Sequence, residues 1–244
     1  MKILAVIPAR YASSRLPGKP LADIEGKPMI QWVYEAVRAS TKIDSLIVAT
    51  DDVRILEVVI GFGGEAEMTS ESHPNGTARC AEVAARHPEF DYVINVQGDE
   101  PLINPEHLET LAGLLDAGTQ IATLCRKLDD MDAVLDAAQV KVVKNLRDEA
   151  LYFSRSAIPF NRDSRVVDYF GHIGLYAFHR DTLRQISTLP EGELEKAENL
   201  EQLRWMEHGY RIRLAEIDEP APSVDTPDGL EKVRALMRVR LNKV

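Results

Sequence analysis

Basic residues crowd a short stretch near the start of the sequence. Arg10, Arg15 and Lys19 follow an apolar run, with serine and glycine residues between them, and no acidic residue precedes Asp23. The whole chain, by contrast, has a formal net charge of -10. Arginine binds phosphate oxygens bidentately, lysine supplies a point charge, and small residues let backbone N–H groups approach an anion. The stretch therefore predicts a triphosphate-binding loop, the alternative being an ordinary solvated turn.

Two acidic residues, far apart in the sequence, could hold a cation beside such a loop. Asp99 stands in the segment QGDEP after an apolar run, and Asp225 stands in the segment SVDTP. Two like charges about 4 Å apart repel by roughly 4 kcal/mol at an effective dielectric constant of about 20. A Mg²⁺ ion bound by one or two carboxylates and by phosphate oxygens removes that repulsion. Asp99 is therefore a candidate magnesium ligand, and Asp225 is a second acidic candidate.

Helix capping is the competing role for these residues. Several polar residues precede two expected helix starts, at Pro105 and Pro227, and could act as N-caps: Asp99, Glu100, Asn104, Asp225 and Thr226. Capping is an especially good explanation for Asp225, because proline is favoured at the first helical position that follows. Residue type and spacing leave both roles open.

Other polar residues could recognise the rest of a nucleotide substrate. The segment HPNGTAR at 73–79 offers amide, hydroxyl and guanidinium donors that could bind a pyrimidine base, although an ordinary helix entry has the same composition. His172 and Arg155 are the polar residues of interest in the second half. A single histidine in an apolar strand is more often structural, and Glu201 and Gln202 would ordinarily belong to a solvated helix face.

Apolar runs that alternate with helical patterns must position these residues. Strands are expected at 3–7, 46–49, 65–68, 92–96 and 121–125, and helices at 28–39, 77–86 and around residues 55–59 and 108–115. This order predicts an α/β fold with a doubly wound, mostly parallel sheet and right-handed crossovers. Loops at the carboxyl ends of parallel strands share one crevice, so the first loop and QGDEP are expected to face each other.

The regular alternation of expected strands and helices ends at about residue 129. Short strands are expected at 140–143 and 151–153, a long strand at 169–178, a helix at 194–208, a strand at 211–215 and a closing helix at 227–241. No repeat or low-complexity linker separates this part from the first. We therefore predict a single domain over 1–244, with an inserted region that packs on the sheet.

Composition limits the class of protein. The 244 residues are 45% hydrophobic, enough for a full core, and the net charge of -10 argues against nucleic-acid binding, which needs a basic surface. No apolar stretch approaches the roughly 18 residues of a membrane span. Cys80 and Cys125 lack metal-type spacing and are expected to be reduced, half-buried thiols. The sequence predicts a cytoplasmic protein that contacts neither membranes nor nucleic acids.

Several segments, in order, resemble the 3-deoxy-manno-octulosonate cytidylyltransferase family over essentially the whole chain. They are IPARYASSRLPGKPL, VATDD, NGTAR, NVQGDEP, LYFSRSAIP, HIGLYAF, LEQLRW and VDTPDGLEKVR. The resemblance implies a fold of the nucleotide-diphospho-sugar transferase type, a homodimer, CTP and two Mg²⁺ ions. It implies transfer of CMP to 3-deoxy-manno-octulosonate (Kdo) for lipopolysaccharide biosynthesis, or alternatively to its 8-amino variant. The related neuraminate enzymes lack this combination of segments.

The resemblance also implies roles for individual residues. Those implied to bind the triphosphate are Arg10, Arg15 and Lys19. Those implied to read the cytosine are Ala9, Asn75, Arg79 and Gln97. The magnesium ligands would be Asp99 and Asp225, which favours a role beyond capping for Asp225. The residues implied to bind the sugar acid are Arg155, His172, Tyr176, Glu201 and Gln202. The CTP-binding part would cover about 1–128, the sugar-binding and dimerisation part about 129–215, and the closing segment about 216–244.

The sequence departs from the family pattern at Asn75, Ala78 and Gly171. Asn75 can still hydrogen-bond a base, whereas Gly171 beside His172 makes the sugar preference less certain. The implied reaction is in-line attack by the anomeric hydroxyl of Kdo on the α-phosphorus of CTP, with release of pyrophosphate. A dinucleotide-dependent oxidoreductase would need G-x-G-x-x-G in the first turn, which is missing. A nucleotide-binding regulator without catalysis would not need both Asp99 and Asp225.

Overall fold

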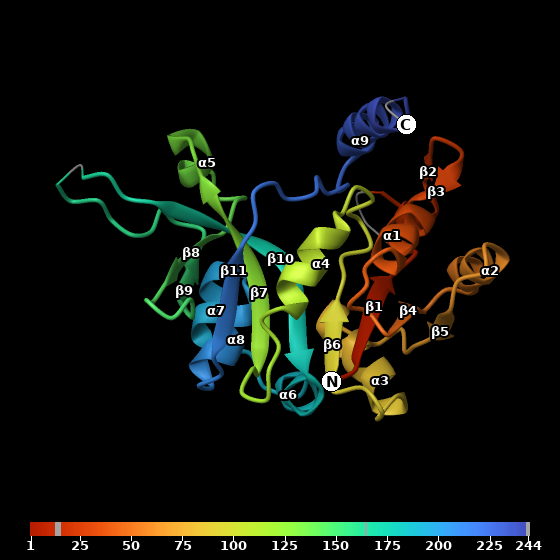
Figure 1. Ribbon diagram of the computed structural model, residues 1–244, viewed down its shortest axis with the longest axis horizontal. Coiled ribbons are helices and arrows are strands. Elements are labelled where there is room, and N and C mark those ends of the chain that lie inside the picture. Colours follow the sequence, from red (N-terminus) through yellow and green to blue (C-terminus); the bar gives the residue numbers. More distant parts are fainter. Residues whose placement is uncertain (13–15, 164, 243–244) are drawn as a thin grey trace. The chain divides into compact units, whose positions relative to one another are not determined.

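The structure is a computed structural model that describes residues 1–12, 16–163 and 165–242 (Figure 1). The chain divides into two compact units, one of Met1–Glu109 with Ala221–Val244 and one of Thr110–Pro220. The first unit contains the basic loop and both acidic candidates. The second unit contains all of the residues that the resemblance assigns to the sugar acid.

Four parallel strands form the sheet of the first unit. Their order is β6 (Tyr92–Asn95), β1 (Ile3–Ala9), β4 (Ser45–Thr50) and β5 (Ala66–Met68), so that β1 lies between β6 and β4 (Figure 1). The apolar side chains at the start of β1 are at most 3% exposed. A parallel strand buried on both faces needs a continuous apolar run, which explains the segment ILAVI. The loops that follow β1 and β6 leave the same edge of this sheet.

Helices accompany the strands of the first unit. They are α1 (Met29–Arg38), α2 (Val53–Gly61), α3 (Gly76–Arg86), α4 (Pro105–Ala112) and α9 (Pro227–Leu241). Asp52, Asn75 and Thr226 are the N-caps of α2, α3 and α9, and each side chain accepts a hydrogen bond from a backbone N–H in the first turn. These bonds satisfy amides that the helix itself leaves without a partner.

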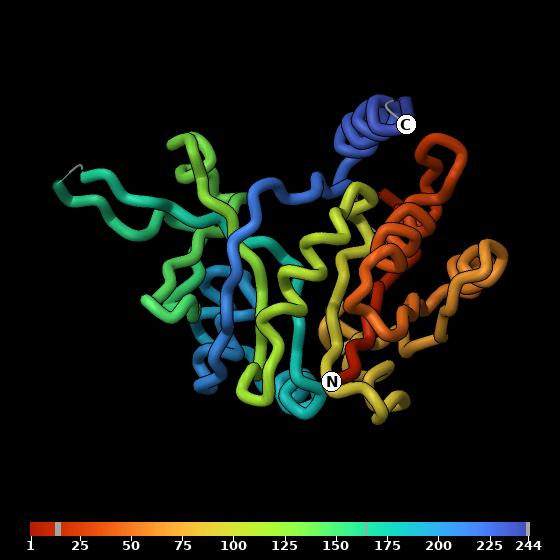
Figure 2. The backbone as a smooth tube through the Cα atoms, viewed as in Figure 1, coloured from red at the N-terminus to blue at the C-terminus, as the bar shows by residue number. Residues whose placement is uncertain are grey.

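The last helix packs on a small hairpin that the sequence did not predict. Strands β2 (Asp23–Ile24) and β3 (Lys27–Pro28) form this hairpin just after the short 3₁₀ helix η1 (Lys19–Leu21), and Figure 2 shows α9 beside it. The members of the buried apolar cluster between them are Ile24, Met29, Val224, Leu230, Val233 and Met237. Arg234 on α9 also donates two hydrogen bonds to the backbone carbonyl of Asp23, at 2.6 and 2.9 Å. The cluster and these bonds fix the segment that leads into α9.

The second unit contains a mixed sheet. Its strands are β7 (Ile121–Leu128), β8 (Lys141–Lys144), β9 (Ala150–Ser154), β10 (Tyr169–His179) and β11 (Ile212–Glu216). Strand β11 runs parallel to β7, while β10 runs antiparallel to both β7 and β8, and β8 and β9 form an antiparallel pair. The α/β class with mostly parallel pairing is thus confirmed: the four-stranded sheet of the first unit is parallel throughout, and antiparallel pairs occur in the β2–β3 hairpin and in the second unit.

Two expectations about the second half are wrong. The predicted helix at 194–208 is two helices, α7 (Glu193–Glu198) and α8 (Glu201–Glu207), because Asn199 adopts a left-handed conformation with φ of 52°. Helices α5 (Met131–Leu135) and α6 (Arg180–Ile186) were not predicted at all. Both are too short to give a clear amphipathic period.

The exposure of the two cysteines also differs from expectation. Cys80 and Cys125 are fully buried rather than half-buried. Cys80 lies on the inner face of α3, and Cys125 lies within β7, where a small apolar side chain fits the core.

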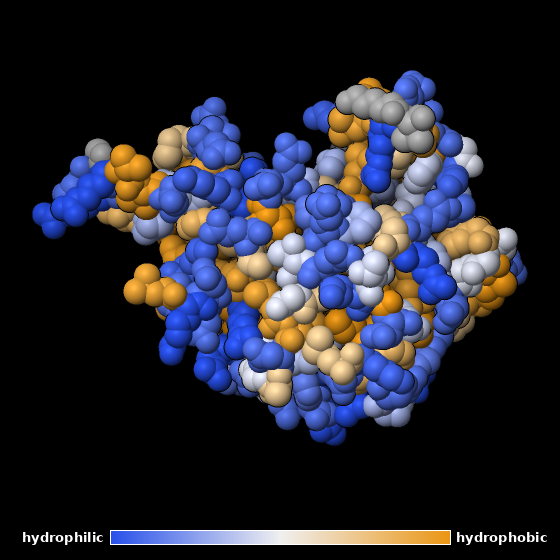
Figure 3. Space-filling view, viewed as in Figure 1, coloured by the Kyte–Doolittle hydropathy of each residue, from blue (hydrophilic) through white to orange (hydrophobic). Residues whose placement is uncertain are grey.

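Exposed large apolar side chains are scattered over several elements. Two of the most exposed lie in the connection between β9 and β10, where Phe160 is 87% exposed and Val166 fully exposed, and Figure 3 shows apolar surface on this arm. Among the described residues, no helix is both long enough and apolar enough to cross a bilayer.

Candidate active site

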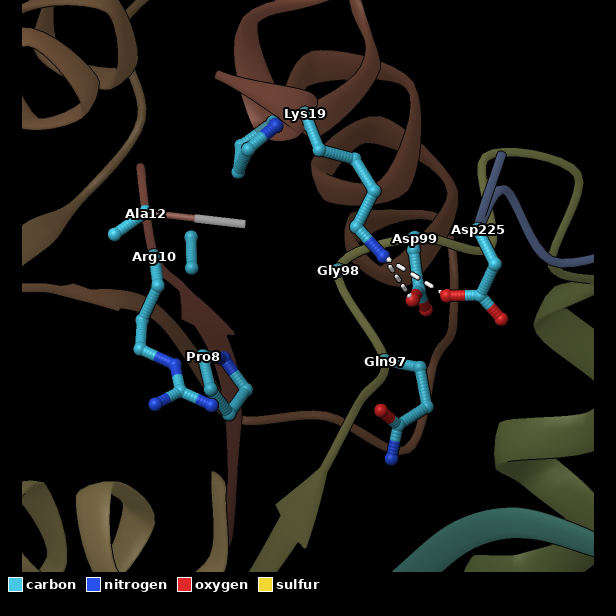
Figure 4. A pocket seen from close by; sticks show the side chains of 10 residues that line it. Pro8, Arg10, Ala12, Lys19, Gln97, Gly98, Asp99 and Asp225 are labelled. Carbon is cyan, nitrogen blue, oxygen red and sulfur yellow. Dashed lines mark hydrogen bonds and ion pairs between the residues drawn. The ribbon is translucent and has the colours of Figure 1, made fainter. Parts of the chain in front are cut away.

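A cavity of about 320 Å³ opens at the carboxyl ends of β1 and β6 (Figure 4). Its lining residues are Pro8, Ala9, Arg10, Ala12, Lys19, Pro20, Gln97, Gly98, Asp99 and Asp225. They come from the first loop, the loop after β6 and the segment before α9. All of them belong to the first unit, and the cavity contains most of the triphosphate and metal candidates expected from the sequence.

The two ends of the first loop are held together by its backbone. The amide of Gly18 donates to the carbonyl of Tyr11 at 3.0 Å, and Gly18 has a φ of 69°, a conformation that suits glycine. A Cβ atom at this position would also lie 3.2 Å from the ring of Tyr11. The guanidinium of Arg54 stacks on the same ring, with its central carbon 3.3 Å from the ring centroid. This packing positions Arg10, just after β1, and Lys19, the first residue of η1.

The loop after β6 passes very close to the end of β1. A Cβ atom on Gly98 would lie 2.9 Å from the carbonyl oxygen of Pro8, which leaves no room for a side chain. The glycine therefore lets the QGDEP segment cross the end of β1 and brings Gln97 and Asp99 to the cavity. Asn104, and not Asp99, accepts the backbone N–H of Glu106 at the start of α4, at 3.0 Å. Capping does not account for Asp99.

The segment before α9 brings Asp225 to the same cavity. The amide of Val224 donates to the carbonyl of Asp99 at 2.8 Å, and the side chain of Val224 is fully buried. Thr226 is the N-cap of α9, with Pro227 at the first helical position. The capping role that competed for Asp225 thus belongs to its neighbour.

Lys19 lies between the two aspartates. Its Nζ atom is 2.6 Å from Oδ2 of Asp99 and 3.4 Å from Oδ1 of Asp225, so the two carboxylates face one cation (Figure 4). The side chains of Lys19 and Asp99 are mostly shielded from solvent, at 19% and 23% exposed, while Asp225 is 51% exposed. Arg10 points away from this pair across the cavity.

This pair of carboxylates fits a magnesium ion that also binds phosphate. Mg²⁺ in phosphoryl-transfer sites is commonly bound by one or two carboxylates together with phosphate oxygens and water. The described residues offer no cluster of three or more histidine, cysteine or acidic side chains that could enclose a metal alone. A cation held by Asp99 and Asp225 would therefore depend on further oxygens from a substrate.

Glu100 is a further acidic residue, next to Asp99 in the chain, and its environment could not be predicted from the sequence. Burial, and secondarily the charge of neighbouring Asp99, raises the pKa of Glu100 from 4.5 to about 8. Its carboxyl group is therefore neutral at pH 7.

The candidates for cytosine recognition fall into two groups. Ala9 and Gln97 line the cavity. Asn75 caps α3, where its Oδ1 atom accepts the amide of Ala78 at 2.9 Å. Arg79 is only 1% exposed, and its guanidinium forms an ion pair with Asp51 at 2.6 Å and a hydrogen bond to Thr69. These contacts give Arg79 a structural role, and a base contact stays a prediction. Arg15 lies outside the described residues.

The sugar candidates lie in the second unit, where two of them have structural partners. Arg155 donates to the backbone carbonyls of Ala137, Glu198 and Asn199, and so holds the end of α7. His172 is half-buried beside Thr123, whose Oγ1 is 3.2 Å from its Nε2. Burial lowers the pKa of His172 from 6.5 to about 3, so this imidazole is neutral over the physiological range.

Tyr176 and the start of α8 complete this set. The ring of Tyr176 packs against His172 and Trp205, with centroids 5.3 and 5.2 Å away. Burial, followed by the charge of Glu201, raises the pKa of Tyr176 well above 10. Glu201 begins α8 and Gln202 is buried next to it. Their sugar-binding roles stay predictions.

Comparisons with known proteins agree with the sequence pattern. A family model described as Cytidylyltransferase matches residues 4–212. A relative from Escherichia coli named 3-deoxy-manno-octulosonate cytidylyltransferase is 50% identical over 242 residues, which cover 98% of each chain. A relative of the same name from Parabacteroides distasonis is 46% identical over 252 residues, which cover 98% of this chain and 100% of the other.

Solved structures show the same relationship. The structure of a CMP:2-keto-3-deoxy-manno-octonic acid synthetase complexed with CTP has a TM-score of 0.95 and 50% identity, covering 98% of this chain and 100% of that chain. A 4-diphosphocytidyl-2C-methyl-D-erythritol synthase from Anaerococcus prevotii has a TM-score of 0.64 at 14% identity, covering 97% of this chain and 99% of that chain, and shares the fold. The predicted family resemblance and fold type are confirmed. The chain therefore belongs to the cytidylyltransferase family.

Proposed function

We propose that this protein transfers CMP from CTP to the anomeric hydroxyl of Kdo and releases pyrophosphate. The observation that carries the proposal is the meeting of Lys19, Asp99 and Asp225, from three distant parts of the sequence, in one cavity. Half of the residues are identical to those of a CMP-Kdo synthetase solved with CTP. The reaction product would be the activated sugar used in lipopolysaccharide biosynthesis.

The cavity supplies charge and position rather than a nucleophile. The hydroxyl oxygen of Kdo forms a bond to the α-phosphorus and releases its proton to solvent, the bond from that phosphorus to the bridging oxygen breaks, and pyrophosphate leaves. Arg10 and Lys19 would bind phosphate oxygens and stabilise the charge that moves onto the leaving group. Gln97 and the backbone at Ala9 would orient the cytosine. Holding the reactants in line in this way can contribute a large part of the rate enhancement.

A bound divalent cation would depend on Asp99 and Asp225. When bound, Mg²⁺ would neutralise phosphate charge and make the attacking hydroxyl more acidic. The two carboxylates would fix its position from the loop after β6 and from the segment before α9. The rigid attachment of both segments, through Gly98 and Val224, suits this role.

The sugar acid would be bound by residues of the second unit. The candidates are Arg155, His172, Tyr176, Glu201 and Gln202. Since His172 is neutral and Tyr176 keeps its proton, both would act as hydrogen-bonding groups rather than as charges. An 8-amino variant of Kdo is the second candidate substrate, because Glu201 supplies a negative charge that an ammonium group could meet.

Pyrophosphate release tests this proposal. The purified protein is incubated with CTP, Mg²⁺ and Kdo, and parallel reactions contain UTP, neuraminate or 8-amino-Kdo in place of the proposed substrates. We expect release with CTP and Kdo, and little with UTP or neuraminate. Release that requires neuraminate, or that never requires a sugar acid, would refute the proposed activity. A higher kcat/KM with 8-amino-Kdo would transfer the proposal to that substrate.

We also propose a cytoplasmic homodimer. The exposed side chains of Phe160 and Val166, on the arm before β10, supply apolar surface that a second copy could cover. A transferase that consumes CTP needs the compartment that contains nucleoside triphosphates. Light scattering on the purified protein tests the assembly, and a monomeric mass at micromolar concentration would contradict it.

A further inference from the structure

The ammonium group of Lys19 lies where a metal ion would have to bind. It is in contact with one oxygen of Asp99 and one of Asp225, at 2.6 and 3.4 Å. The backbone on both sides is fixed, since the amide of Lys19 donates to Leu16 at 3.1 Å and its carbonyl accepts from Ala22 at 3.1 Å. The long, unbranched side chain is therefore the part of Lys19 that can change position.

Lys19 and a divalent cation would compete for the same oxygens. A cation between the two carboxylates would be close to the ammonium group, and two positive charges at that distance repel each other. The lysine therefore has to leave the pair before the pair can hold a metal. It leaves at low energetic cost only if other anionic oxygens accept its three N–H donors, and the phosphates of a nucleotide are such oxygens.

We propose that Lys19 is a counter-ion that makes metal binding at Asp99 and Asp225 depend on the nucleotide. Without nucleotide, the lysine neutralises part of the charge of the pair and excludes the metal. When the triphosphate binds, the ammonium group moves to phosphate oxygens and both aspartates become available. The inference rests on the proposed function, and it adds an order of binding in which free metal does not precede the nucleotide.

Binding of Mn²⁺ tests this order without any turnover. Free Mn²⁺ is measured by its electron paramagnetic resonance signal during titration of wild type, Lys19→Met and Lys19→Arg, each with and without CTP. Without CTP we expect Lys19→Met to bind Mn²⁺ about tenfold more tightly than wild type, since two partly shielded ion pairs no longer compete. Lys19→Arg keeps the charge and should bind Mn²⁺ as weakly as wild type. Addition of CTP should tighten Mn²⁺ binding strongly in wild type and much less in Lys19→Met.

A second lysine provides a matched control. Lys27 forms an ion pair with Glu35 at 2.7 Å on the surface of the same unit, away from the cavity lining. Lys27→Met removes the same charge from the protein but exposes only one carboxylate. It should leave Mn²⁺ binding unchanged. Equal tightening in Lys27→Met and Lys19→Met would mean that net charge alone is responsible, and the proposal would fall.

Asp99→Asn separates this inference from the proposed function. Combined with Lys19→Met, it should remove the tight Mn²⁺ binding seen without CTP. If Asp99→Asn does not weaken Mn²⁺ binding in the presence of CTP, the metal assignment itself is wrong. If it does, but Lys19→Met binds free Mn²⁺ no more tightly than wild type, only the counter-ion role of Lys19 is refuted. Far-ultraviolet circular dichroism of each variant confirms that it is folded.

Discussion

Replacement of Arg79 by methionine distinguishes a structural role from a role in base recognition. The guanidinium is 1% exposed and pairs with Asp51, which is itself only 14% exposed, at 2.6 Å. This contact joins α3 to the residue after β4, and a hydrogen bond to Thr69 joins it to the residue after β5. The arginine thus connects α3 to the carboxyl ends of β4 and β5.

The expected cost is large, because the substitution leaves a carboxylate without its partner. Removal of one member of a buried ion pair typically costs about 3–5 kcal/mol, and the partial exposure of Asp51 favours the lower end of that range. Arg79→Met should therefore lower the free energy of unfolding by about 3 kcal/mol. The double variant Arg79→Met, Asp51→Asn should recover part of this loss, since it no longer contains an unpaired buried charge.

Urea denaturation of the single and double variants measures these differences, and steady-state kinetics measures the ratio of kcat/KM for CTP and UTP. We expect lower stability with an unchanged preference for CTP. The double variant is the control, because its recovery identifies the ion pair as the cause. A single variant that keeps its stability within about 0.5 kcal/mol but accepts UTP would refute the structural role and establish base contact.

Three further predictions concern other residues. Asp99→Asn should keep the fold, since it removes charge and little volume, but lose CTP turnover; near-normal pyrophosphate release would contradict the metal assignment. Arg54→Ala should raise KM for CTP several-fold with a smaller change in kcat, because it loosens the stacking on Tyr11 that fixes the phosphate loop; Arg38→Ala, on α1, is the control. Because burial lowers the pKa of His172 from 6.5 to about 3, the unfolded chain binds a proton below pH 6.5 that the folded chain does not. Stability should therefore fall between pH 6.5 and pH 3, by about 2 kcal/mol at pH 5, and His172→Gln should remove that part of the dependence in urea titrations.

The elements that could be predicted from the sequence are those whose pattern of apolar residues lies within the element itself. The apolar runs of β1, β4 and β6 lie within the structure they specify, and their positions agree with expectation. The break at Asn199 is different, because a single left-handed residue leaves the helical period of the flanking residues intact. The hairpin of β2 and β3 has only two residues per strand, too few for an alternating pattern.

The site was harder to predict where its contacts are distant in the chain. The role of Asp225 depends on Val224 bonding to Asp99 and on the packing of α9, and neither follows from the residues around it. The ion pair of Arg79 could not be predicted either, because its partner, Asp51, precedes it by 28 residues. Residue types could be matched to a family pattern, but burial and pairing required the folded chain.

The docking of α9 has a consequence for how this protein tolerates proteolysis. Asp225 lines the cavity from the segment that leads into α9, and its neighbour Val224 belongs to the apolar cluster with that helix. A chain clipped so that residues 221–242 are lost would keep the basic loop and Asp99 but would lose Asp225. We expect such a fragment to transfer no CMP.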